Sequence, residues 1–155
     1  MRLTELLNAQ AITTRLRAST KREAIAELVS LLETAHGIDS QGEILDRVLH
    51  REGSMTTGIG NGIAIPHGKA RMIYRPFAAC GVAPVGIEFE SLDGEPATLL
   101  ILLVSPESAG ALHVKVLANI SRLLKESSVR QSLREATGPE AFLAILLAAE
   151  AVHIP

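Results

Sequence analysis

The residues best suited to chemistry lie in one stretch, Arg51 to Lys69, which reads REGSMTTGIGNGIAIPHGK. Pro66 fixes its own φ and biases Ile65 toward an extended backbone, so residues 63–65 are expected to form a strand that delivers His67. An imidazole at the end of a rigid strand, beside a glycine-rich loop and an arginine, indicates a nucleophilic histidine with an oxyanion ligand. Local chemistry alone leaves a purely structural histidine open as the alternative.

The pattern that ends at His67 resembles the signature of a known family. The match R-E-x-x-x-x-T-G-I-G-x-G-I-A-I-P-H is similar to the phosphorylation site of the enzyme IIA components of the bacterial phosphotransferase system, in the fructose/mannitol type. A second block, from Ser91 to Leu124, resembles the strand and helix that follow in that family. With the preceding amphipathic helices, the resemblance covers nearly the whole chain.

This resemblance implies a role for each matching residue. His67 would accept a phosphoryl group as a tele-phosphohistidine, with a histidine phosphocarrier protein as the donor. His113, in the block LHVKVL, matches the second active-site histidine of the family and would help to orient that group. Arg51 completes the catalytic set, and the acceptor would be a regulatory target protein or a IIB component.

The residue types suit this reaction. A neutral imidazole is nucleophilic near its ordinary pKa of about 6.5, and transfer needs positive or N–H-rich surroundings for the phosphoryl oxygens. The Arg51 guanidinium offers a two-pronged fork that lysine does not reproduce. Backbone N–H groups are expected from a phosphoryl-binding loop that comprises Thr57, Gly58, Ile59, Gly60 and Gly62.

A structural reading stands beside each of these roles. Arg51 falls at the end of an expected helix, where a cation complements the helix dipole. His113 shares an inward face with Val116 and can be a core histidine. The Thr57 hydroxyl can shape the loop as well as donate to a ligand. Glu52 is expected to be structural, because a carboxylate would repel a phosphoryl group.

No cofactor is expected. The donor already carries an activated phosphoryl group, so neither a nucleotide nor Mg²⁺ is required, and the sequence has no Walker-type lysine motif. A zinc site from His50, His67 and His113 is not favoured, because neither an HxxxH-type spacing nor a cysteine pair supports it. His36, His50 and His153 match no catalytic position.

Composition sets the class of protein. The 155 residues fit one domain, 1–155, and 47% hydrophobic with 21% charged residues indicates a globular chain. A net charge of -2 argues against nucleic-acid binding. The single Cys80 excludes an internal disulfide, and neither a signal peptide nor a membrane-spanning segment is recognisable. The expected compartment is the cytoplasm.

Helical and strand patterns alternate along the chain, which predicts an α/β fold. The resemblance implies a mixed β-sheet flanked by helices on both sides. Thr20 is expected to cap a helix that Gly37 ends, and Asp39 or Ser40 to open the next. The other expected elements are a short N-terminal helix, strands near 11–16, 77–85 and 98–104, helices 109–125 and 129–135, and a final helix from Pro139.

The apolar final helix predicts burial against the sheet, with a self-association face, and hence a homodimer, as the alternative. Within the family, the start LTELL and the block PESAGALHVKVLANISRLL favour the nitrogen-regulatory type over a sugar-specific IIA. A binding module that has lost phosphoryl transfer would lack His67 or Arg51, and both are present.

Overall fold

Strand β6 is the centre of the fold, because its apolar side chains are buried on both faces. In the computed structural model, which describes residues 1–155, β6 pairs with an antiparallel β5 on one side and with parallel β3 and β4 on the other. β1 lies parallel to β5, and β2 forms a hairpin with β3, so the sheet is mixed and open. The strands are β1 (Ile12–Thr13), β2 (Gly58–Gly60), β3 (Ile63–Ala64), β4 (His67–Ala70), β5 (Phe77–Ile87) and β6 (Ala97–Pro106).

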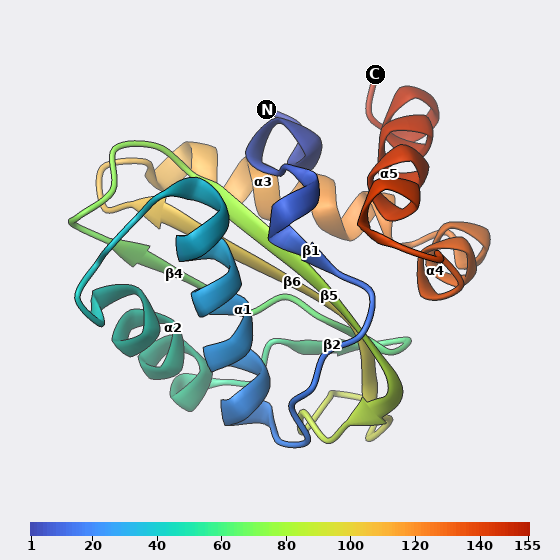
Figure 1. Cartoon of the computed structure of the whole chain (residues 1–155), viewed down its shortest axis with the longest axis horizontal. Coiled ribbons are helices and arrows are strands. Elements are labelled where there is room, and N and C mark those ends of the chain that lie inside the picture. Colours follow the sequence, from blue (N-terminus) through green and yellow to red (C-terminus); the bar gives the residue numbers. More distant parts are fainter.

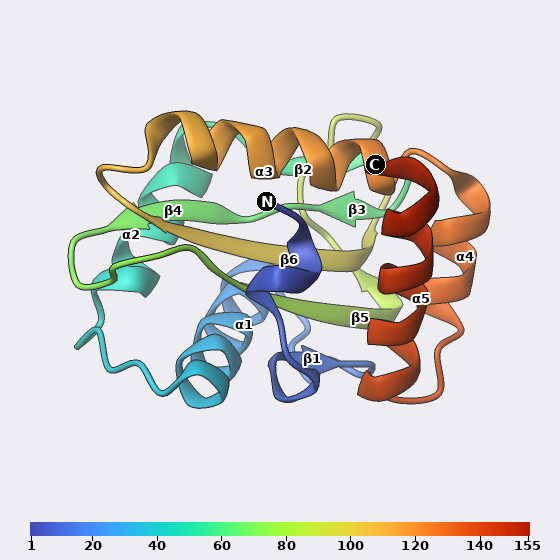
Figure 2. The ribbon, with the colours of Figure 1, turned by 90° about the horizontal axis from the view of Figure 1, so that it is seen from above.

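Helices cover both faces of this sheet, which confirms the expected class. Figures 1 and 2 show α1 and α2 on one face, and α3 with α5 on the other. Two clusters of 21 and 20 buried residues fill the two interfaces, so neither face is left to solvent. The helices are α1 (Lys21–His36), α2 (Glu43–Ser54), α3 (Gly110–Leu123), α4 (Ser127–Arg134) and α5 (Pro139–His153).

The ends of α1 follow the sequence signals. The Thr20 side chain accepts a hydrogen bond from the N–H of Glu23, whose carboxylate in turn accepts from the Thr20 N–H, so the expected cap is a full capping box. Gly37 ends the helix in the left-handed region.

The start of α2 differs from the prediction of Asp39 or Ser40. The helix begins at Glu43, because Gln41 and Gly42 have φ values of 54° and 88° that no right-handed helix accommodates. The Ser40 hydroxyl still accepts a hydrogen bond from the N–H of Ile44, at 3.2 Å. The polar side chain that was expected to open the helix therefore caps it from three residues upstream.

Three strand predictions need correction. The N-terminal segment holds two 3₁₀ turns, η1 (Leu3–Leu6) and η2 (Ala9–Ala11), and the strand after them is only Ile12–Thr13. β5 continues to Ile87 through a bulge after Val82 that places Pro84 at the surface. The strand expected at 63–65 ends at Ala64, and His67 opens β4 instead.

The final helix packs as the sequence predicts. Phe142, Leu146 and Ala149 are buried in the core of the α3 side, while Leu147 and Val152 are exposed to solvent. Self-association through that exposed side stays a prediction. None of the helices combines the length and apolar character that crossing a membrane requires.

Candidate active site

Main-chain hydrogen bonds hold His67 at the start of β4. His67 pairs with Leu103 of the central strand, and the Leu103 N–H donates to the carbonyl of Pro66, at 3.1 Å. The N–H of Ile65 donates to the carbonyl of Thr57, at 3.0 Å. The backbone is therefore fixed on both sides of the proline, and the imidazole projects from a rigid support.

The hydrogen bond of the His67 ring determines its tautomer. Its Nδ1 lies 2.8 Å from the carbonyl oxygen of Ile65. A carbonyl oxygen only accepts hydrogen bonds, so Nδ1 carries the proton and Nε2 keeps a free lone pair. Nε2 is the nitrogen that a tele-phosphohistidine requires, which agrees with the role that the resemblance implies.

Helix α2 approaches β4 very closely at Gly68. A Cβ atom at this position would lie 3.1 Å from the backbone nitrogen of Val48, so the glycine leaves room for helix against strand. The approach carries one face of α2 to the imidazole, because residues at spacings of three and four share a helix face. That face presents Arg47, His50 and Arg51.

A cavity of about 270 Å³ opens beside the imidazole. Its wall is formed by this face of α2, by the first residues of β4 and by the second histidine expected at the site, which lies on α3. The lining contains neither an acidic nor a hydrophobic side chain, so it suits an anion. The lining residues are Arg47, His50, Arg51, His67, Gly68, Lys69 and His113.

The structure thus brings together the three predicted catalytic residues. The ring centroids of His67 and His113 lie 5.4 Å apart, with the ring planes tilted by 55°. His113 is buried in the first turns of α3, and its Nδ1 lies 2.7 Å from the Ser105 hydroxyl. Arg51 borders the same cavity and lies in the last turn of α2, a position that is compatible with either of the roles predicted for it.

The three cations of the cavity differ in how they are engaged. Arg47 forms a 2.8 Å ion pair with Glu107. Arg51 donates through Nη1 to the carbonyl of Met55 just beyond α2, at 2.7 Å, which leaves its other N–H groups available. Lys69 takes part in none of the salt bridges of the chain, so its ammonium is the cation most available to a ligand.

Burial keeps both site imidazoles neutral. Desolvation lowers the pKa of His67, and the nearby Arg51 lowers it further, although the Ile65 carbonyl and Glu52 oppose them. Desolvation also lowers the pKa of His113, to about 4, with His67 and Lys69 adding to the effect. Both rings are therefore uncharged near pH 7, and the fixed positive charge of the cavity comes from arginine and lysine.

The glycine-rich stretch folds as the hairpin of β2 and β3, and its role as a phosphoryl-binding loop stays a prediction. Gly58–Gly60 forms strand β2, and neither these glycines nor Gly62 lines the cavity, although Ile59 borders a neighbouring one with His67. The glycines serve local geometry. Gly62 has a φ of 75°, and a Cβ there would lie 2.6 Å from the guanidinium of Arg134, which donates to the carbonyl of Asn61.

Thr57 is absent from the lining of the cationic cavity, although it borders the neighbouring hollow together with Ile59 and His67. Its hydroxyl and its N–H both donate to the buried carboxylate of Glu52. These contacts agree with the reading in which Thr57 shapes the loop, and donation to a ligand stays a prediction. The same contacts agree with the expectation that Glu52 is structural.

Sequence reasoning missed four of the cavity residues, and for three of them the sequence contained a signal. Arg47, His50 and Arg51 share a helix face by their spacing, so the catalytic assignment of one of them indicates the other two. Lys69 follows His67 by two residues in a strand, which places both side chains on the same face. No group of three or more His, Cys, Asp or Glu side chains is arranged to hold a metal ion.

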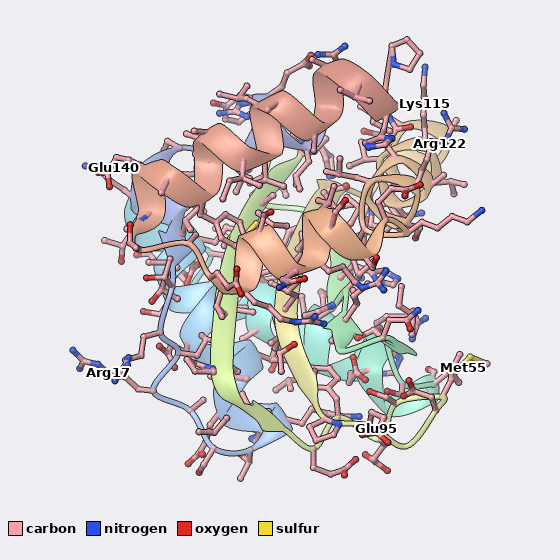
Figure 3. The ribbon with its side chains drawn as sticks, turned by 90° about the vertical axis from the view of Figure 1, so that its right-hand side faces the viewer. Arg17, Met55, Glu95, Lys115, Arg122 and Glu140 are labelled. Atoms are coloured by element: carbon pink, nitrogen blue, oxygen red, sulfur yellow. The ribbon has the colours of Figure 1, made fainter.

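A second, more apolar hollow of about 250 Å³ also reaches His67. Three exposed side chains from three separate segments border it: Met55 after α2, Ile59 of β2 and Leu92 of the β5–β6 connection, which are 65%, 42% and 74% exposed. Figure 3 shows Met55 projecting away from the fold at the margin of the molecule. The cationic cavity is thus flanked by an exposed apolar surface.

Comparison with known proteins places the chain in a family. Its fold is that of a IIA-type component of a phosphotransferase system. Residues 5–149 match the family model described as "Phosphoenolpyruvate-dependent sugar phosphotransferase system, EIIA 2", and the chain belongs to this family.

Relatives of two kinds are similar to the chain. The "Nitrogen regulatory protein" of Bradyrhizobium diazoefficiens is 36% identical over 94% of this chain and 95% of its own length. The "PTS system fructose-specific EIIABC component" of Bacillus subtilis is 35% identical over 94% of this chain, which spans only 23% of that longer protein.

Solved structures agree with the sequence relatives. "Nitrogen Regulatory Protein IIA-Ntr" from Neisseria meningitidis matches with a TM-score of 0.85 and 29% identity, over 92% of this chain and 97% of that one. Enzyme IIA mannitol of Escherichia coli, in its complex with phosphorylated enzyme IIB mannitol, matches with a TM-score of 0.78 and 25% identity, over 92% and 97%. The mixed sheet between helices is therefore the fold of this family.

The low pKa of His113 predicts acid sensitivity of the fold. Its ordinary pKa of 6.5 falls to about 4 in the folded chain, so the unfolded chain binds more protons between these values. The contribution of neutral His113 to the free energy of unfolding is complete above pH 6.5. This contribution is lost as the pH falls toward 4, and the loss amounts to up to roughly 3 kcal/mol. Urea unfolding of the parent and of His113→Gln at several pH values measures it. The parent should lose stability more steeply than the variant, and equal slopes would contradict this prediction.

Proposed function

We propose that this chain is a phosphoryl carrier that works in the cytoplasm and uses His67 as its acceptor. The observation that carries the proposal is the free lone pair of Nε2 in a cavity whose charged side chains are all cations. In the exchange, the bond between Nε2 and phosphorus forms while the N–P bond of a donor phosphohistidine breaks. The electron pair of the broken bond stays on the donor ring, so the reaction balances between two imidazoles.

The cavity residues would stabilise the transferring group. Its equatorial oxygens spread negative charge in the transition state, and preorganised cations lower the energy of that charge. The unused N–H groups of Arg51 and the ammonium of Lys69 are suited to these oxygens. His113, close to the His67 ring, would add a further donor once the phosphoryl group is in place.

We further propose that the donor is a histidine phosphocarrier protein and that the acceptor is a regulatory partner, as in a nitrogen-regulatory IIA. The IIA-Ntr structure, with its TM-score of 0.85, supports this assignment. The alternative acceptor is a sugar-specific IIB component, which the fructose-specific relative and the IIA–IIB mannitol complex favour. Transfer from the phosphorylated chain to purified IIB proteins separates the two roles.

Phosphorylation should depend on His67 alone. Incubation with phosphoenolpyruvate and the upstream phosphotransferase proteins, followed by intact-mass measurement, should show one acid-labile phosphoryl group. His67→Ala should remove the group and keep the fold, whereas His153→Ala, at the end of α5, should label like the parent. Undiminished labelling of His67→Ala would overturn the assignment.

Replacing Arg51 by lysine should slow the transfer. The change keeps the charge but loses the planar fork, and loss of one preorganised donor at a developing charge costs on the order of 3 kcal/mol in barrier height. Rapid-quench kinetics of phosphoryl transfer measure the effect. Arg130→Lys is the matched control, because Arg130 also donates to main-chain carbonyls at a helix end but lies outside the cavity. A rate within twofold of the parent would leave Arg51 only its helix-end role.

Phosphorylation should raise the pKa of His113 from its low resting value. A phosphoryl group on His67 brings negative charge beside the ring, which favours the protonated imidazole. Protonated His113 should then stabilise phospho-His67, most fully below pH 4 and less as the pH climbs through the raised pKa. NMR titration of the imidazole signals with and without phosphorylation tests this. An unmoved His113 titration would assign the residue to the core.

A further inference from the structure

A chain of hydrogen bonds runs from the first residue of α1 to the imidazole of His67. The buried carboxylate of Glu52 accepts from the ammonium of Lys21 at 3.0 Å and from the N–H of Thr57 at 2.8 Å, and it also accepts from the Thr57 hydroxyl. Three donors thus converge on one carboxylate that is only 7% exposed. A buried carboxylate needs such partners, so these three contacts depend on one another.

The chain continues along the backbone. The carbonyl of Thr57 accepts from the N–H of Ile65 at 3.0 Å, and the carbonyl of Ile65 accepts from Nδ1–H of His67 at 2.8 Å. Glu52 accepts hydrogen bonds from both the N–H and the hydroxyl of Thr57, and it thereby fixes the backbone of that residue. Ile65 precedes a proline, which narrows the conformations open to its carbonyl.

We infer that Lys21, Glu52 and Thr57 are positioning residues that hold His67 in its Nδ1–H tautomer, with the Nε2 lone pair free for the cavity. The role in transfer rests on the proposed function, whereas the effect on the tautomer does not. A shift of the Ile65 carbonyl weakens the only bond that assigns the proton to Nδ1. The proton then resides on Nε2 in a fraction of the molecules, and a protonated Nε2 has no lone pair with which to act as a nucleophile.

The chain contains a matched control for this network. Thr4 of η1 donates to the buried carboxylate of Glu150 in α5 through both its N–H, at 3.1 Å, and its hydroxyl. The geometry repeats that of Thr57 and Glu52. The pair ties the N-terminal turn to the last helix, near the two chain ends in Figure 2 and outside the cavity of His67.

The test compares the two threonine–glutamate pairs. Thr57→Val and Glu52→Gln remove a hydroxyl or a charge from the network, and Thr57→Ser retains the hydroxyl. Thr4→Val and Glu150→Gln make the same changes in the control pair. Nitrogen-15 NMR of the unphosphorylated proteins reads the tautomer of His67 directly, thermal unfolding reads stability, and rapid-quench kinetics read phosphoryl transfer.

In the network variants, the NMR signals of His67 should change from those of the Nδ1–H tautomer alone to those of a mixture of tautomers. Phosphoryl transfer should be slower by about tenfold or more. Thr57→Ser should keep the parent pattern. The control variants should have a lower melting temperature, but their His67 tautomer and their transfer rate should equal those of the parent.

Parent-like tautomers and rates in folded Thr57→Val or Glu52→Gln would overturn the inference, and so would equal tautomer shifts in the control variants. If neither network variant folds, Lys21→Met decides in the same way, because Lys21 belongs to neither of the two buried core clusters and Thr57 still donates twice to Glu52. A parent that shows the expected tautomers but accepts no phosphoryl group would refute the proposed function and leave the positioning network standing.

Discussion

The close approach of α2 to β4 at Gly68 is the constraint on which the site depends. The strand supplies the imidazole, and the helix supplies two arginines on one side and the buried Glu52 on the other. A methyl group at position 68 would press on the backbone nitrogen of Val48, at 3.1 Å. Displacing the helix there would move the cations and the carboxylate away from His67 at the same time, since one rigid element carries both sets.

The electrostatics of the cavity depend on two features, the burial of its histidines and the fixed charge of its other polar side chains. The protein as a whole is slightly acidic, yet the cavity collects cations and excludes acids from its wall. Neutral imidazoles complement this arrangement, because a protonated His67 would have no lone pair to offer and would add repulsion among the cations. The positive charge therefore resides on arginine and lysine side chains, and the His67 imidazole stays uncharged.

The sequence predicts those parts of the site that depend on local chemistry. The proline before His67, the capping box of α1 and the wholly apolar β6 follow from short patterns, and the structure confirms the expected order of helices and strands. The sequence did not predict the glycine hairpin, because glycines that admit a positive φ or a close neighbour look the same in sequence as glycines that cradle an anion. The partnership of Thr57 with Glu52 was out of reach, since it depends on how the last turn of α2 meets the hairpin.

The imidazole of His67 and the exposed apolar side chains around it come from different kinds of element. His67 is fixed by the central sheet, whereas Met55, Ile59 and Leu92 stand on connections and on a short edge strand. Substitutions on those segments alter the exposed apolar surface without moving the imidazole, because the sheet and not the segments sets its position. The architecture thus lets the surface beside His67 vary independently of the histidine. Such independence is compatible with a family whose members carry names as different as nitrogen regulatory protein and fructose-specific EIIABC component.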